Sequence, residues 1–127
     1  MEHTVLVVED EPAIRALIKA CLAREPRLQV ILAEDGLEGV EAARSAHPAL
    51  VFLDVRMPRM DGIEACRALR SHPETREARI VMLTAMGQDT DIERGYEAGA
   101  DDYFLKPFAP DDLLDKARSA LGIRVAA

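Results

Sequence analysis

Five short apolar runs alternate with amphipathic segments along the chain, and this alternation restricts its fold more than any other feature. The apolar runs predict strands at Thr4–Val8, Leu28–Ala33, Leu50–Asp54, Arg79–Leu83 and Asp102–Leu105. The amphipathic segments predict helices from Pro12 to before Pro26, over Leu37–Ala46, from Asp61 to before Ser71, over Gln88–Ala98 and over Ala109–Leu121. Strict alternation is typical of an α/β domain whose parallel sheet is covered by helices on both faces and joined by right-handed crossovers.

Asp54 is the first candidate functional residue. Four apolar residues, Leu50–Leu53, lead directly into it, and turn residues follow at Met57-Pro58 and Asp61-Gly62. An apolar run closed by turn residues fits a strand buried on both faces. A carboxylate at the end of such a strand is costly to bury unless it has a partner or a function. Because ligands bind at the carboxyl ends of parallel strands in open α/β sheets, Asp54 lies where a site is expected.

Other predicted strands also end in residues that can do chemistry. The first is followed by Glu9-Asp10, the fourth by Thr84 and the fifth by Lys106. Each residue alone is commonly a turn, cap or loop residue, but parallel strands would bring them together at one edge. Clustered carboxylates repel each other, and Mg²⁺, which prefers oxygen ligands, would relieve that repulsion. With a lysine and a hydroxyl nearby, the set suits transfer of a phosphoryl group to an aspartate.

Length and charge exclude several classes of function. The 127 residues predict a single domain spanning 1–127, and the net charge of −7 argues against binding nucleic acid directly or attaching to an anionic membrane. No signal peptide or transmembrane run is visible, so a cytoplasmic location is expected. Cys21 and Cys66 fall in helical patterns and are expected to be small buried side chains without a disulfide.

Four motifs resemble those of the receiver domains of bacterial two-component response regulators. They read VLVVEDEPAIR, LVFLDVRMPRMDG, IVMLTA and EAGADDYFLKPF, in that order. The resemblance extends from about Thr4 to Leu121, with a frayed tail expected after Gly122. It implies a flavodoxin-like (βα)5 fold with a central five-stranded parallel sheet in the order 2-1-3-4-5.

The resemblance also implies the role of each acidic residue. Asp54 would accept a phosphoryl group from a sensor histidine kinase or a histidine phosphotransfer protein. Asp10 and Asp54 would bind Mg²⁺, with Mn²⁺ able to substitute, and Glu9 would act on the metal through water. The backbone carbonyl of Arg56 would complete the protein's metal ligands.

The remaining site residues would bind the phosphoryl group and report its presence. Lys106 would pair with phosphoryl oxygens, and its peptide bond to Pro107 would be cis. Thr84 would be the hydroxyl that moves toward the phosphoryl group, and the backbone N–H of Ala85 would approach a phosphoryl oxygen. Tyr103 would rotate inward when Thr84 moves.

Three positions depart from the commonest family pattern or vary within it. Glu9 replaces an aspartate that is often found there. Arg56 and Met86 stand two residues beyond Asp54 and Thr84, where the family tunes hydrolysis of the phosphoryl group. The lifetime of a phosphorylated state is therefore open.

The expected output is a change in the face formed by the fourth helix, the fifth strand and the last helix. Weak helix propensity in Gln88–Ala98 makes that segment the expected bistable element. A downstream effector protein would bind this face, with the chain a monomer or a phosphorylation-dependent dimer.

The alternative is a receiver from a longer transcription factor that dimerises through charges such as Asp101, Asp102 and Lys116. Ile92 and Ile123 stand where that class usually has basic residues, which weakens this alternative and favours a stand-alone receiver that binds a partner protein. Ile92 fits either an apolar docking patch or core packing.

The sequence argues against two other classes of protein. A metal-dependent phosphohydrolase commonly carries a DxD motif, and Asp54-Val55-Arg56 lacks its second aspartate. A pseudo-receiver that cannot take phosphate is disfavoured because Glu9, Asp10, Asp54, Thr84 and Lys106 are all present. The chain is thus expected to be a switch rather than an enzyme, at most assisting its own phosphorylation and dephosphorylation.

Overall fold

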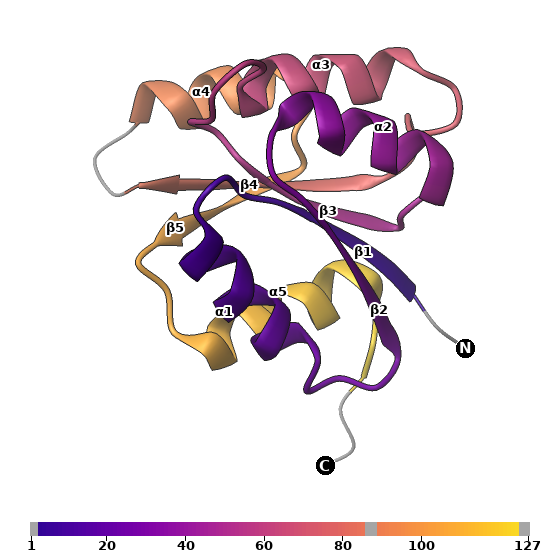
Figure 1. Cartoon of the computed structure of the whole chain (residues 1–127), viewed down its shortest axis with the longest axis vertical. Coiled ribbons are helices and arrows are strands. Elements are labelled where there is room, and N and C mark those ends of the chain that lie inside the picture. The colour runs from indigo at the N-terminus through magenta and orange to yellow at the C-terminus, as the bar shows by residue number, and fades with distance from the viewer. Residues whose placement is uncertain (1–2, 86–88, 125–127) are drawn as a thin grey trace.

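The computed structural model describes residues 3–85 and 89–124, and there strands and helices alternate five times (Figure 1). The strands are β1 (His3–Val8), β2 (Leu28–Ala33), β3 (Leu50–Asp54), β4 (Arg79–Ala85) and β5 (Asp102–Lys106). The helices are α1 (Pro12–Leu22), α2 (Gly36–Ala46), α3 (Gly62–Ser71), α4 (Asp89–Ala98) and α5 (Pro110–Leu121). The sequence prediction of an alternating α/β chain is confirmed. Met86, and the predicted start of the fourth helix at Gln88, lie outside the described residues.

The five strands form one parallel sheet in the order β2-β1-β3-β4-β5, as the resemblance implied. Val8 lies opposite Leu53, and Asp54 opposite Leu83, so β1, β3 and β4 reach the same edge together. The ladder between β4 and β5 continues through Thr84 and Lys106, beyond the predicted strand ends. The sequence analysis ended these two strands at their last apolar residues, Leu83 and Leu105. Backbone pairing does not depend on side-chain polarity, so the strands continue further.

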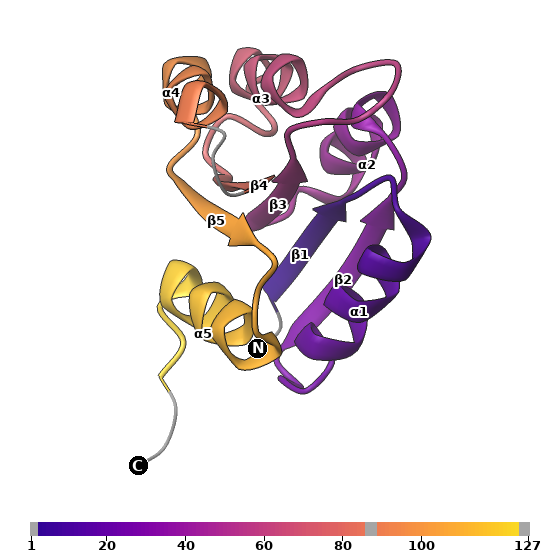
Figure 2. The ribbon, with the colours of Figure 1, turned by 90° about the vertical axis from the view of Figure 1, so that its left-hand side faces the viewer.

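Helices cover both faces of the sheet. Figure 1 shows α2, α3 and α4 on one face and α1 and α5 on the other, and Figure 2 shows the same layers from the side. Each interface holds its own apolar cluster, and β3 contributes to both because successive side chains point to opposite faces. Leu53 lies in the cluster under α2 and α3, and Phe52 in the one under α1 and α5. The strand that ends in Asp54 is therefore held from both sides.

Local sequence fixes where the helices begin. Prolines open α1 and α5, where a missing N–H costs no helical hydrogen bond. Asp61 and Glu64 form a capping box at the start of α3. Gly62, which follows Asp61, lies very close to the end of β3. A Cβ at this position would stand 2.2 Å from the carbonyl oxygen of Asp54. The start of α3 is thus packed directly against the backbone of Asp54.

The C-terminal end of α5 is also fixed. Gly122 adopts a left-handed conformation (φ 68°), and the N–H of Ile123 donates to the carbonyl of Arg118 at 2.8 Å. Ile123 still packs against the cluster under α1 and α5, so the expected fraying does not begin directly after Gly122. Residues 125–127 lie outside the described part of the chain.

Both cysteines are buried and unpaired, as predicted. The thiol of Cys21 lies 2.7 Å from the carbonyl oxygen of Pro110, and burial is the main cause that raises its pKa. Burial likewise raises the pKa of Cys66 to about 11. Among the described residues, neither thiol belongs to the group of possible metal ligands at the sheet edge. Among the described helices, none has both the length and the apolar character needed to cross a bilayer.

Candidate functional site

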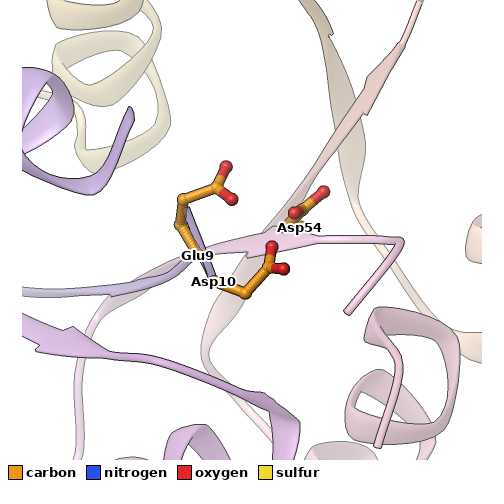
Figure 3. Close-up of side chains that lie close together, drawn as sticks. All are labelled: Glu9, Asp10 and Asp54. Carbon is orange, nitrogen blue, oxygen red and sulfur yellow. The ribbon is translucent and has the colours of Figure 1, made fainter. Parts of the chain in front are cut away.

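Three carboxylates meet at the carboxyl edge of the sheet. Glu9 and Asp10 follow β1, and Asp54 ends β3 (Figure 3). Ligand oxygens from the three side chains all lie within 4.8 Å of one another. Glu9 and Asp54 are buried, and Asp10 is half-buried. The clustering that the strand ends predicted is confirmed.

Lys106 is the last residue of β5, the outer strand of the sheet, and its side chain reaches the carboxylate cluster. Its Nζ lies 2.6 Å from Oε1 of Glu9 and 3.3 Å from Oδ1 of Asp54. Its peptide bond to Pro107 is cis, as the resemblance implied. One ammonium group therefore partly neutralises two buried carboxylates, and a net negative charge is left for a further cation.

The protonation of Asp54 reflects this crowding. Burial, and then the negative charge of Glu9, raise the pKa of Asp54 to about 7, although Lys106 acts in the opposite direction. Burial alone would lower the pKa of Lys106, but its hydrogen bond to Glu9 and the charge of Asp54 raise that pKa above its ordinary value. Near neutral pH, Asp54 can therefore hold a proton that a bound cation would displace.

The donor set fits Mg²⁺. All three side chains offer hard oxygen ligands, which Mg²⁺ prefers, and it commonly keeps several waters while using one or two carboxylates. Both oxygens of Glu9 are already engaged: Oε1 accepts from Lys106, and Oε2 accepts from the N–H of Glu11 at 3.2 Å. This favours Asp10 and Asp54 as direct ligands and agrees with an indirect role for Glu9.

Arg15 binds the backbone of Glu9 and Asp10, a contact that the sequence analysis did not predict. Its Nη1 donates to the carbonyl of Glu9 at 2.8 Å and to that of Asp10 at 3.4 Å. Its Nη2 lies 3.4 Å from Oε1 of Glu34. The sequence shows only that Arg15 follows Ile14, on the apolar side of the predicted first helix. An arginine at such a position is common in helices, so it did not indicate this contact. The guanidinium holds the backbone that carries two of the three carboxylates.

Thr84 presents a buried hydroxyl to the same site. Its Oγ1 is buried and has no hydrogen-bond partner among the described residues. Thr84 and Ala85 line a cavity of about 240 Å³ together with Asp54 and Lys106. A buried hydroxyl without a partner calls for an explanation, because such groups are almost always satisfied. A ligand oxygen entering this cavity would supply the partner.

The residues expected to report the switch lie on α4, β5 and α5, with Asp101 directly before β5. Tyr103 of β5 is half-buried and packs edge-to-face against Tyr96 of α4, with ring centroids 6.2 Å apart. Asp102 pairs with Lys116 at 2.6 Å within the chain, and Asp101 pairs with Arg70 at 2.8 Å. Ile92, at the start of α4, is half-buried. The roles assigned to Tyr103 and Thr84 stay predictions.

Arg56 has a contact that the sequence did not reveal. Its Nε lies 2.9 Å from Oδ2 of Asp91, and its Nη2 lies 3.4 Å from Oδ1. The side chain thus joins the loop after β3 to the first turn of α4. The role of its backbone carbonyl as a metal ligand stays a prediction.

Fold and site together define a class of protein. A doubly wound five-stranded parallel domain, with a carboxylate cluster, a lysine and a buried hydroxyl at its carboxyl edge, is built as a signal receiver. The sequence model described as "Response regulator receiver domain" matches residues 5–118. The chain belongs to the response regulator receiver domain family of two-component signalling.

Individual relatives agree with this assignment. The transcriptional regulatory protein SrrA of Staphylococcus aureus is 40% identical over 121 residues, which are 95% of this chain and 48% of SrrA. The chain therefore spans about half the length of the curated relatives it matches.

Solved structures show the same fold. Chemotaxis protein CheY4 of Vibrio cholerae superposes with a TM-score of 0.87 at 29% identity, covering 94% of this chain and 99% of that one. The receiver domain of sensor histidine kinase PA1611 of Pseudomonas aeruginosa, with a magnesium ion in its active-site cleft, gives 0.86 at 32% identity, covering 96% and 99%.

Proposed function

We propose that this receiver is a switch operated by Mg²⁺-dependent transfer of a phosphoryl group to Asp54. The observation that carries the proposal is the meeting of three carboxylates within 4.8 Å, with Lys106 3.3 Å from Asp54 and a buried, unpartnered hydroxyl on Thr84 lining the same cavity. The donor is a phosphohistidine on a sensor histidine kinase or a histidine phosphotransfer protein.

In the transfer, an oxygen of Asp54 forms a bond to phosphorus while the bond from phosphorus to the donor histidine nitrogen breaks. The released imidazole nitrogen takes a proton from solvent. Asp54 must be ionised to attack, so the proton favoured by its raised pKa has to leave first. Lys106 pairs with the equatorial phosphoryl oxygens, where charge accumulates.

Asp10, Asp54 and the backbone carbonyl of Arg56 would hold Mg²⁺, and Glu9 would contact it through water. When bound, the ion shields the incoming phosphoryl group from these carboxylates and stabilises negative charge on its oxygens. The PA1611 receiver, which shares this fold, holds magnesium in its active-site cleft. Mn²⁺, which also prefers oxygen ligands, would substitute.

Phosphorylation would change the face formed by α4, β5 and α5. Thr84 would move to donate to a phosphoryl oxygen beside the N–H of Ala85, and Tyr103 would turn into the space that Thr84 leaves. A downstream effector protein would bind the altered face. The chain would act in the cytoplasm as a phospho-accepting switch without turning over a substrate, beyond assisting its own phosphorylation and dephosphorylation.

Dimerisation of a transcription factor through the same face is the second candidate, and the SrrA match motivates it. The charges that would form such an interface are occupied within the chain. Asp102 pairs with Lys116, and Asp101 accepts from both Arg70 and the N–H of Ile80. Dimerisation would require these pairs to exchange partners, so we favour a partner protein.

Intact-mass spectrometry after incubation with acetyl phosphate and Mg²⁺ tests the proposal. We expect the mass of one phosphoryl group to be gained by the native chain and not in EDTA. Asp54→Asn should gain none, whereas Asp101→Asn, which removes an exposed carboxylate distant in the fold, should label normally. Labelling of Asp54→Asn at the native level would overturn the assignment of the acceptor.

A further inference from the structure

The ion pair between Arg56 and Asp91 ties the phosphorylation site to α4. Arg56 is the second residue after Asp54, and Asp91 lies in the first turn of α4. The guanidinium meets both carboxylate oxygens, at 2.9 and 3.4 Å. Such two-point contacts fix orientation as well as adding energy. Of the cationic side chains in the described residues, only Arg56 lies within ion-pair distance of Asp91.

The two partners are very unequally buried. The side chain of Arg56 is 70% exposed, whereas that of Asp91 is 5% exposed. The guanidinium can therefore turn away and remain hydrated. The carboxylate cannot, because a buried charge without its partner is strongly unfavourable. If Arg56 leaves, the first turn of α4 is no longer held at the loop after β3, and its movement would bring the charge of Asp91 to water.

Both residues also line the cavity that holds Asp54, Thr84 and Lys106. A phosphoryl group on Asp54 adds a charge of roughly −1.5 to −2 to this cavity. Arginine suits phosphate oxygens well, because its planar fork presents several donors and its charge is weakly hydrated. A phosphoryl group would thus compete with Asp91 for the guanidinium.

We propose that Arg56 is a positioning residue that exchanges Asp91 for the phosphoryl group and so releases the first turn of α4. This inference rests on the proposed phosphorylation of Asp54. It adds a second connection to α4, separate from the one through Thr84 and Tyr103. In the unphosphorylated state the same pair holds α4 against the loop after β3.

The resting half of the proposal is tested without metal or phosphate. Amide hydrogen exchange is measured for residues 93–98 of α4 in the native chain, Arg56→Met, Asp91→Asn and the double variant. We expect Arg56→Met to speed exchange in α4 about tenfold or more and to leave α5 unchanged. Adding Asp91→Asn should reverse most of that increase, because a neutral amide needs no counter-charge. A change under twofold in Arg56→Met, or no reversal in the double variant, would overturn the proposal.

Arg94→Met is the matched control. Arg94 is an exposed arginine of α4 and forms no ion pair with any described residue. It lines a second cleft, which shares Arg56 and Asp91 with the cavity of Asp54. Its replacement should leave exchange in α4 within twofold of the native rate. A tenfold increase in this control would mean that loss of any arginine loosens the helix, and the specific role of Arg56 would be wrong.

The exchange of partners is tested with beryllofluoride and Mg²⁺, which stand in for the phosphoryl group. In the native chain, exchange in α4 should rise toward the level of metal-free Arg56→Met, and in Arg56→Met it should rise by a clearly smaller factor, through the connection by Thr84 and Tyr103 alone. Equal increases in both proteins would overturn the exchange of partners. If beryllofluoride causes no NMR shift at Thr84 or Ala85 in the native chain, the proposed function fails instead, and the metal-free comparison still decides whether Arg56 holds α4.

Discussion

The ammonium group of Lys106 lies 2.6 Å from Oε1 of Glu9 and so connects β5 to β1 across the two strands between them. The same group is 3.3 Å from Asp54. Lys106 is thus paired mainly with Glu9, while Asp54 keeps a raised pKa. If Asp54 is the acceptor that we propose, the lysine already lies beside it and would have to shift little to meet a phosphoryl oxygen.

Lys106→Met should separate metal binding from switching. Removing a cation from beside the carboxylates removes its repulsion of Mg²⁺, so Mg²⁺ affinity should be unchanged or up to about tenfold tighter. Beryllofluoride should no longer shift the Tyr103 resonances, because its fluorine atoms, which take the places of the phosphoryl oxygens, lose their fixed cation. Calorimetry and NMR give the two readouts, with Lys116→Met as the control for loss of a lysine. Native beryllofluoride shifts in Lys106→Met would show that the role given to Lys106 is wrong.

The protonation of Asp54 predicts how stability depends on pH. Its pKa is about 7 in the folded, metal-free chain, against an ordinary value of about 4 when unfolded. Between these values the folded state binds more protons than the unfolded state, so Asp54 lowers the free energy of unfolding as pH rises from about 4 to about 7. Asp54→Asn removes this loss. In EDTA, urea denaturation should show Asp54→Asn gaining stability over the native chain across that window, with no further gain above about pH 8.

Mg²⁺ should abolish much of that difference. The ion binds the ionised carboxylate, so saturating Mg²⁺ should stabilise the native chain more than Asp54→Asn at pH 8. A constant difference between the two proteins from pH 4 to pH 8 would contradict the raised pKa. An equal response of both proteins to Mg²⁺ would contradict Asp54 as a ligand.

The carboxylate cluster could be predicted from the sequence because it depends only on where the apolar runs end and on parallel pairing of the strands. Apolar runs that end in Asp54 or Glu9-Asp10 fix which edge of the sheet those residues occupy, and parallel pairing then brings them together. The pairs Arg56–Asp91 and Arg15 with the backbone of Glu9 could not be predicted this way. With 16 basic and 23 acidic residues in the chain, far more pairings are conceivable than form, and no periodicity selects among them. They depend on loop paths and side-chain rotamers that only the packed structure defines.

Glu25 gives a pH-dependent prediction at the opposite end of the molecule from the site. Hydrogen bonds from Arg27, with a further one from Arg118, lower the pKa of Glu25 to about 2. A lowered folded-state pKa contributes stability that is complete above about 4.5 and is lost as pH falls toward 2. The stability difference between the native chain and Glu25→Gln should therefore be largest from pH 5 to 7 and shrink below pH 4.5. Urea denaturation measures it, with the exposed Glu41→Gln as control, and a difference that does not shrink in acid would refute the linkage.

Gly62→Ala should damage fold and site together. Its Cβ would stand 2.2 Å from the carbonyl oxygen of Asp54 and 2.8 Å from Cα of Val55, and neither backbone atom can give way as a flexible side chain could. We expect a loss of about 2 kcal/mol or more in the free energy of unfolding, since overpacking against backbone is poorly relieved. Relief by shifting the start of α3 or the end of β3 would move Asp54, so Mg²⁺ affinity should fall as well.

Gly95→Ala separates this clash from a general effect of replacing glycine. A Cβ at Gly95 would meet Cγ of Met82 at 3.2 Å, which is the flexible part of a side chain. Alanine in a helix interior is favoured over glycine by about 1 kcal/mol, so Gly95→Ala should be nearly neutral or stabilising, with native Mg²⁺ affinity. If Gly62→Ala keeps native stability and native Mg²⁺ affinity, the close packing of α3 on Asp54 does not position the acceptor. If stability falls but Mg²⁺ affinity does not, Asp54 is held by the sheet alone.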